Sequence, residues 1–185
     1  MSTQPLQQAI ATTRGVMANV TPDQLGDPTP CASWSVGQLI NHIIGGQVFF
    51  TAGLNGVTPS AEEVDYSAGD YLSSFDTASA GALDAFGADG ALTKIVKMPF
   101  GDMPGAALLG LATTDTFQHG WDLAKATGQS TELAPELAAG LLAQSQQAIS
   151  DAFRGPEGAP FGPEQDCPDG ASAADQLAAF LGRAV

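Results

Sequence analysis

The sequence predicts an all-α protein in which residues 1–185 form one domain, a bundle of four main helices with short additions. Apolar residues recur every three or four positions along four long segments, the period of an amphipathic helix. Residues that favour helix ends, such as serine, proline and glycine, flank these segments. No segment repeats, and hydrophobic residues make up 44% of the chain, enough for a substantial core.

The first two helices are expected from Pro5 to the break at Thr21-Pro22, and from Ser35 to about Asn55. Proline is favoured in a first helical turn, where its missing N–H costs nothing. Ser35 and Gln38 have the spacing of a capping box, which marks the start of the second helix. The proline-containing segment 26–33 between the two helices is expected to be a loop.

A third helix is expected over residues 71–86, after a polar loop around residues 59–65. Leu92 to Met98 alternates in polarity, and Pro99-Phe100-Gly101 favours a turn, so a short β-hairpin is predicted there. The longest helical pattern follows over residues 104–127, ending before Gly128.

Beyond the bundle, a fifth helix is expected from Pro135 to Phe153. The segment 155–170 is rich in proline and glycine and is expected to run as an extended strap over the surface. Ser172 and Asp175 then cap a short C-terminal helix, whose apolar face should dock on the bundle.

Charge and hydropathy exclude several classes of protein. With 20 acidic and 6 basic residues the net charge is −14, which disfavours nucleic acid and anionic membrane surfaces as partners. The N-terminus lacks the apolar core of a signal peptide, and the most apolar stretch, 39–54, is too short and too polar to cross a bilayer. A cytoplasmic location is expected. Cys31 and Cys167 form no metal or redox motif and are expected to be buried thiols.

Three polar residues occupy the apolar stripe of the helix over 104–127. Asp115, His119 and Asp122 follow at i, i+4 and i+7, so all three are expected to face the core. A buried carboxylate loses several kcal/mol of hydration unless it is paired or bound to a metal. An Asp/His pair four residues apart directs both side chains to one point, as in helical zinc motifs.

His42 lies at the edge of the apolar stripe of the second helix, and Gly46, one turn on, is expected to leave room beside its imidazole. His42, Asp115 and His119 together would offer two nitrogens and one oxygen to a divalent metal ion, leaving at least one position for water or substrate. The alternative is that Asp115 and His119 bond each other while His42 caps a polar group, with no ion.

Other candidates carry weaker signals. Cys31 precedes a helix, where it could be a nucleophile, although a small buried side chain beside Trp34 is the preferred interpretation. Asp122 could orient a ligand histidine or accept a bond from a helix terminus. Lys94 and Lys97 are expected to be solvated charges at a strand edge.

The chain also resembles a known family through motifs spread over nearly its whole length. These are Thr29-Pro30-Cys31-x-x-Trp34-Ser35-Val36, Leu39-x-x-His42, Pro99-Phe100-Gly101, Pro104-Gly105, His119-Gly120-Trp121-Asp122-Leu123-Ala124-x-Ala126-Thr127-Gly128 and Leu181-Gly182-Arg183. They are similar to stand-alone metal-binding proteins of the DinB superfamily, which are related to the N-terminal domain of mycothiol-dependent maleylpyruvate isomerase.

The resemblance implies a DinB-like four-helix bundle that holds a divalent metal ion, zinc foremost, with nickel, iron or manganese as other candidates. The implied ligands are His42, Asp115 and His119. The family pattern carries glutamate where this chain has Asp115, and the shorter acid is expected to weaken metal binding. Only a short segment follows the bundle in place of the isomerase's second domain, so maleylpyruvate isomerisation is not expected to carry over.

The implied activity is metal activation of a low-molecular-weight thiol, mycothiol, whose thiolate attacks a small electrophile in S-transfer or thiol-assisted isomerisation. Two alternatives remain at this point. One is a metal-dependent hydrolase with Asp122 as its base, and the other is a non-enzymatic metal-dependent sensor or ligand-binding module. The sequence leaves the oligomeric state open, with a homodimer as one option.

Overall fold

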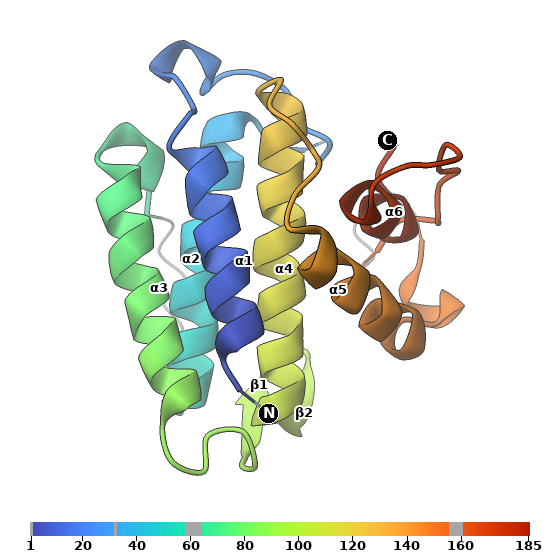
Figure 1. The fold of residues 1–185 in the computed structure, drawn as a ribbon. Coiled ribbons are helices and arrows are strands. Elements are labelled where there is room, and N and C mark those ends of the chain that lie inside the picture. The colour runs from blue at the N-terminus through green and yellow to red at the C-terminus, as the bar shows by residue number, and fades with distance from the viewer. Residues whose placement is uncertain (1, 32, 58–63, 156–160) are drawn as a thin grey trace.

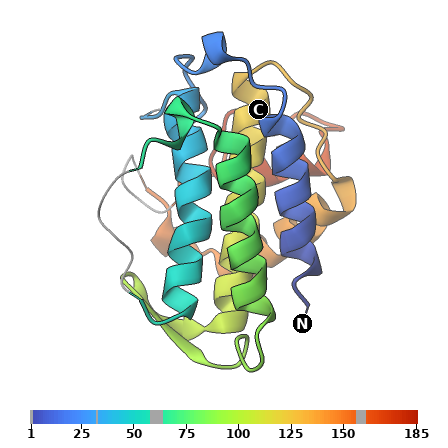
Figure 2. The ribbon, with the colours of Figure 1, turned by 90° about the vertical axis from the view of Figure 1, so that its left-hand side faces the viewer.

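The computed structural model describes residues 2–31, 33–57, 64–155 and 161–185. Its four long helices form the expected bundle, which confirms the predicted fold class (Figure 1). They are α1 (Gln4–Met17), α2 (Val36–Leu54), α3 (Tyr71–Gly87) and α4 (Gly105–Ala126). Helix α4 packs against α1 and α2, and α2 also packs against α3. Seen from the α3 side, α1 and α2 flank α3, and α4 lies behind them (Figure 2).

The helix starts follow the expected local chemistry. The Ser35 side chain accepts a hydrogen bond from the Gln38 N–H, and the Gln38 side chain bonds the Ser35 backbone, so the predicted capping box is present. Pro5 lies in the first turn of α1. Helix α1 ends at Met17, earlier than the expected break at Thr21-Pro22, where a 3₁₀ turn (Pro22–Gln24) begins.

The predicted hairpin is present but shorter than expected. Strands β1 (Ile95–Met98) and β2 (Gly101–Pro104) pair antiparallel, with Met98 opposite Gly101. Residues 92–94, expected in the first strand, form turns instead. The backbone carbonyls of Leu92 and Lys94 accept hydrogen bonds from the first N–H groups of α4. These residues therefore cap α4, whose first N–H groups lack partners within the helix.

Two further helices, α5 (Pro135–Ala148) and α6 (Ala173–Phe180), lie on the outer side of α4 (Figure 1). Their apolar residues surround Trp121 and form a second hydrophobic cluster beside the main core. The short C-terminal helix is thus confirmed, but α5 stops five residues before the expected end at Phe153. Ile149 is extended and packs against the second cluster, and a 3₁₀ turn (Asp151–Phe153) follows.

Helices α1 and α4 are in close contact where they cross at Gly120. A Cβ on Gly120 would lie 2.3 Å from the Thr13 hydroxyl oxygen, so only glycine fits at this crossing. The Thr13 hydroxyl donates to the Thr116 carbonyl. Parts of the loop expected around 59–65 and of the strap expected over 155–170 lie outside the described residues. None of the described helices has the length and apolarity needed to span a membrane.

Candidate metal centre

Helices α2 and α4 bring the three predicted ligands together. His42 comes from α2, whereas Asp115 and His119 are one turn apart on α4. The Asp115 Oδ1 atom lies 3.8 Å from His42 Nε2 and 3.6 Å from His119 Nε2. The donor atoms of all three residues lie within 4.8 Å of one another. Two helices from distant parts of the chain therefore direct their donors at one point.

The distances from Asp115 to the two histidines match those between ligands of one metal ion. Both exceed the roughly 2.7–3.2 Å of an N–H···O hydrogen bond. Ligand atoms that bind a tetrahedral zinc ion at about 2.0–2.2 Å stand roughly 3.3–3.6 Å apart. The alternative in which Asp115 and His119 hydrogen bond each other does not agree with the 3.6 Å separation. The residues present fit a divalent cation.

The site is open to solvent on one side. The side chain of His119 is 11% exposed, that of Asp115 24% and that of His42 36%. The expectation that Asp115 lies in the middle of a buried stripe is therefore wrong. The carboxylate lies at the margin of the core, where a small molecule could reach a cation held by the three residues.

Trp34 and Gly46 shape the surroundings of the ligands. The Trp34 ring packs 4.3 Å from the His42 ring and 5.8 Å from the His119 ring, centroid to centroid. Gly46 was expected to leave room for an imidazole, but a Cβ there would lie 3.3 Å from Asp115 Oδ2. The missing side chain of Gly46 therefore makes space for the Asp115 carboxylate.

Asp122 is fully buried directly behind His119, with 0% of its side chain exposed. Its Oδ2 lies 2.9 Å from His119 Nδ1, on the side of the ring opposite the candidate metal position. Arg183 donates to both carboxylate oxygens, at 3.1 and 3.0 Å, and Gln118 donates a third bond at 3.3 Å. Asp122 thus has the geometry of a residue that orients a ligand histidine.

The sequence interpretation gave Arg183 no role in the site. The residue lies in the tail after α6, far from α4 along the chain. Two signals for it were available: a buried carboxylate in a chain with only 6 basic residues requires one of them as a partner, and Arg183 stands in the family motif Leu181-Gly182-Arg183. Which of the six basic residues pairs with Asp122 depends on how the C-terminal segment folds back.

Charge interactions set the protonation of these groups. Burial by itself raises the pKa of Asp122, but the hydrogen bond and charge of His119 and the charge of Arg183 lower it to about 2. Burial lowers the pKa of His119, whereas its bonds to Asp122 and Cys31 and the charges of Asp115 and Asp122 raise it to about 10. The pKa of Asp115, which burial alone raises, is lowered by His42 and His119. Asp115 and Asp122 are therefore ionised, and their negative charges offset the positive charges of His119 and Arg183.

Cys31 adjoins the site from the loop before α2. Both cysteines are free and half-buried, not buried as expected. The Cys31 thiol donates to Asp122 Oδ2 at 3.2 Å, and its sulfur is 3.8 Å from His119 Nδ1. Cys31, His119 and Asp122 form a second group with close donor atoms. The Arg183 guanidinium, 3.5 Å from the sulfur, brings positive charge there and disfavours a cation.

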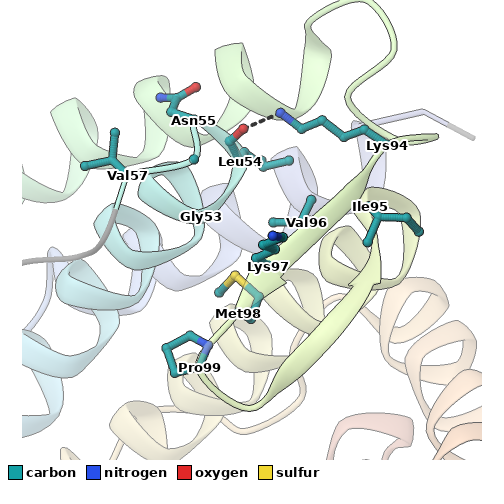
Figure 3. A pocket seen from close by; sticks show the side chains of 11 residues that line it. Gly53, Leu54, Asn55, Val57, Lys94, Ile95, Val96, Lys97, Met98 and Pro99 are labelled. Atoms are coloured by element: carbon teal, nitrogen blue, oxygen red, sulfur yellow. Dashed lines mark hydrogen bonds between the residues drawn. The ribbon is translucent and has the colours of Figure 1, made fainter.

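A surface groove lies between the end of α2 and the hairpin, lined by residues 53–57 and 94–99 (Figure 3). Lys94 and Lys97 are exposed as expected, and Lys94 Nζ also donates to the Leu54 carbonyl at the end of α2. Among the described residues that line the groove, none is a candidate ligand. The groove is therefore separate from the metal centre.

The fold and the donor set define a helical bundle with a candidate metal centre between its second and fourth helices. Comparison with known families agrees with the resemblance noted in the sequence. The family model of the mycothiol maleylpyruvate isomerase N-terminal domain matches residues 6–124, and the chain belongs to this family. The match includes all three candidate ligands.

Relatives and solved structures add to this assignment. Two proteins from two strains of Mycobacterium tuberculosis, each named only as an uncharacterized protein, are 44% identical over 187 residues, spanning 100% of this chain and 97% of theirs. The crystal structure of the mycothiol-dependent maleylpyruvate isomerase matches with a TM-score of 0.61 and 16% identity, over 76% of this chain and 66% of that one. The structural match shows a shared fold.

Proposed function

We propose that this protein binds a divalent metal ion, zinc foremost, through His42, Asp115 and His119, and uses it to activate mycothiol against a small electrophile. The observation that carries the proposal is the convergence of three donors on a solvent-accessible point, with Asp115 3.6 and 3.8 Å from the two imidazoles and all three donors within 4.8 Å of one another. Membership of the mycothiol maleylpyruvate isomerase N-terminal domain family supports mycothiol as the thiol.

A divalent cation held by these three residues would supply the positive charge that favours the ionised form of a thiol. The residues around it have separate tasks. Asp122 orients His119 from behind, Trp34 packs against the His42 ring, and the exposed edges of His42 and Asp115 leave an approach for small molecules. Among the described residues three donors converge, and a tetrahedral cation held by them would have one position open to a small molecule.

The reaction forms a bond between the thiol sulfur and an electrophilic carbon. In S-transfer a leaving group departs from that carbon with the bonding electron pair, and the thiol proton passes to solvent. In thiol-assisted isomerisation the thiol adds to an unsaturated acid, a carbon–carbon bond rotates, and the thiol leaves unchanged. Both reactions use the same site.

The position of Asp122 argues against the hydrolase alternative, which requires this residue as its general base. Asp122 was the candidate, but it is fully buried and faces His119 Nδ1, away from the Nε2 side of the ring. Its oxygens already accept bonds from His119, Arg183, Gln118 and Cys31. A carboxylate bound in this way does not reach a molecule on the open side of the site.

Elemental analysis of the purified protein tests the metal centre. The wild type should carry about one equivalent of divalent metal, whereas the double variant His42→Ala, His119→Ala should carry almost none. Cys167→Ser, in which a half-buried thiol outside both donor groups is changed, serves as the matched control and should keep its metal. Equal, near-zero metal in wild type and double variant would refute the centre.

Thiol dependence tests the activity. Monochlorobimane is a suitable electrophile, since its fluorescence rises when a thiol sulfur displaces chloride. The wild type should accelerate adduct formation with mycothiol, and the double variant should not. Turnover of an ester substrate without thiol would support hydrolysis instead, and tight binding of mycothiol without any turnover would support a sensor or ligand-binding module.

A further inference from the structure

The C-terminal tail reaches the metal centre through one side chain. Arg183 follows the end of α6 and donates from Nε to Asp122 Oδ1 at 3.1 Å and from Nη2 to Asp122 Oδ2 at 3.0 Å. This two-point geometry matches a guanidinium fork to a carboxylate. Arg183 lies beyond residue 124, where the family model ends, but within the motif Leu181-Gly182-Arg183 that contributes to the resemblance.

Four of the five N–H donors of Arg183 are directed at groups of the protein itself. Its Nη1 donates to the Leu181 carbonyl at 3.3 Å, and its Nη2 also approaches the Cys31 sulfur at 3.5 Å. The side chain is only 19% exposed, and its partner Asp122 is fully buried. Arg183 therefore acts on the site through Asp122.

The pair Asp122–Arg183 determines which nitrogen of His119 carries a proton. A carboxylate bound by a guanidinium can only accept, so His119 Nδ1, at 2.9 Å, must be the donor. In the neutral imidazole the lone pair is then on Nε2, the nitrogen that faces Asp115 and His42. When a metal ion displaces the Nε2 proton, the remaining proton therefore stays on Nδ1, where Asp122 accepts it.

We propose that Arg183 is a positioning residue of the metal centre, which locks Asp122 and thereby fixes His119 with Nε2 toward the metal position. This inference rests on the proposed function, since it assumes the metal site at His42, Asp115 and His119. It makes the C-terminal tail part of the site, although the tail contributes no ligand.

Other contacts hold the tail in place independently of Arg183. Trp121 Nε1 donates to Asp175 Oδ1 at 2.9 Å, and Arg154 Nη1 donates to the Phe180 carbonyl at 2.7 Å. Leu177 and Leu181 are buried in the second hydrophobic cluster. A substitution at Arg183 should therefore leave α6 docked and disturb mainly Asp122 and His119.

Zinc affinity, measured by competition with a chromophoric chelator, tests the role of Arg183. Arg183→Gln should weaken zinc binding by about 10- to 100-fold, the usual effect of losing a residue that orients a ligand. Arg183→Lys should lose less zinc affinity, because lysine keeps the positive charge but cannot make the two-point contact with the carboxylate. Arg14→Gln is the matched control: Arg14 makes the same two-point contact with a carboxylate, that of Asp76, but at the exposed surface, and this variant should keep wild-type affinity.

A readout of His119 itself separates positioning from simple destabilisation. In zinc-loaded wild type, ¹⁵N NMR of the imidazole should show the proton on Nδ1 and zinc on Nε2. Arg183→Gln should broaden or shift these signals, and Asp122→Asn, a second variant, should do the same. If wild type binds zinc through the three ligands and both variants keep its affinity and spectra, the inference is wrong and the proposed function stands. If wild type binds no zinc, both are wrong.

Discussion

At the scale of single residues, Asp115 is the feature that most affects the proposed metal centre, because the family resemblance implies glutamate at this position. The shorter acid was expected to lack reach. In the structure Asp115 Oδ1 already lies at 3.6 and 3.8 Å from the two imidazole nitrogens, and Gly46 leaves room for its other oxygen. Asp115 therefore reaches both imidazoles despite its shorter side chain.

Asp115→Glu should consequently retain zinc binding to within about tenfold of wild type, or tighten it, because the open side of the site can accept one methylene. Asp115→Asn should weaken binding by more than about tenfold, since an uncharged amide oxygen is a poor zinc ligand. Competition titrations of both variants measure this. A marked loss in the glutamate variant would show that the backbone is adapted strictly to aspartate.

At the scale of elements, α6 is held against α4 by a polar contact inside an apolar interface. Asp175 accepts from Trp121 Nε1 and from the Ser172 hydroxyl, while its own N–H donates to Ser172 Oγ. Burial would raise the pKa of Asp175, but the bonds from Trp121 and Ser172 outweigh it and lower that pKa. Ionised Asp175 therefore stabilises the docked helix.

Asp175→Asn should lower the free energy of unfolding by about 1 kcal/mol at pH 7, because the charge-assisted bond from Trp121 is weakened. The folded pKa lies below the unfolded one, so this stabilisation is present above about pH 4 and disappears as the pH falls through the folded pKa. Urea unfolding of wild type and variant at pH 7 and near pH 2 measures the difference. Asp169→Asn, at an exposed position, is the control. An equal gap at both pH values would contradict the assignment.

The sequence pattern predicted those helices in which the buried residues recur with the period of an α-helix. The helices over α1 to α4 and the cap at Ser35 were predicted because their apolar residues and capping groups agree. The end of α5 was not predicted correctly, because Ile149 continues the apolar pattern although its backbone is extended. The candidate ligands followed from i, i+4 spacing and the family motifs. The place of Arg183 depends on how two later helices fold back, which no local period encodes.

At the scale of the whole molecule, the proposed metal ion would join two helices that are far apart in the sequence. His42 lies on α2 and the other two ligands on α4, with α3 and the hairpin between them along the chain. An unfolded chain does not bring these donors together, so a cation bound there stabilises the native state only. The acidic chain, with its net charge of −14, also gains from added positive charge.

Zinc at about 100 times its dissociation constant should therefore raise the free energy of unfolding by about 2.7 kcal/mol. For a chain of this length that corresponds to a rise of roughly 5–11 °C in Tm. Thermal unfolding followed by circular dichroism, with zinc and then with excess EDTA, measures the change and its reversal. The double variant His42→Ala, His119→Ala should show no shift, and magnesium at the same concentration should have little effect, because it prefers oxygen ligands. An equal zinc shift in the double variant would place the ion on the acidic surface, since the stabilisation would then need neither imidazole.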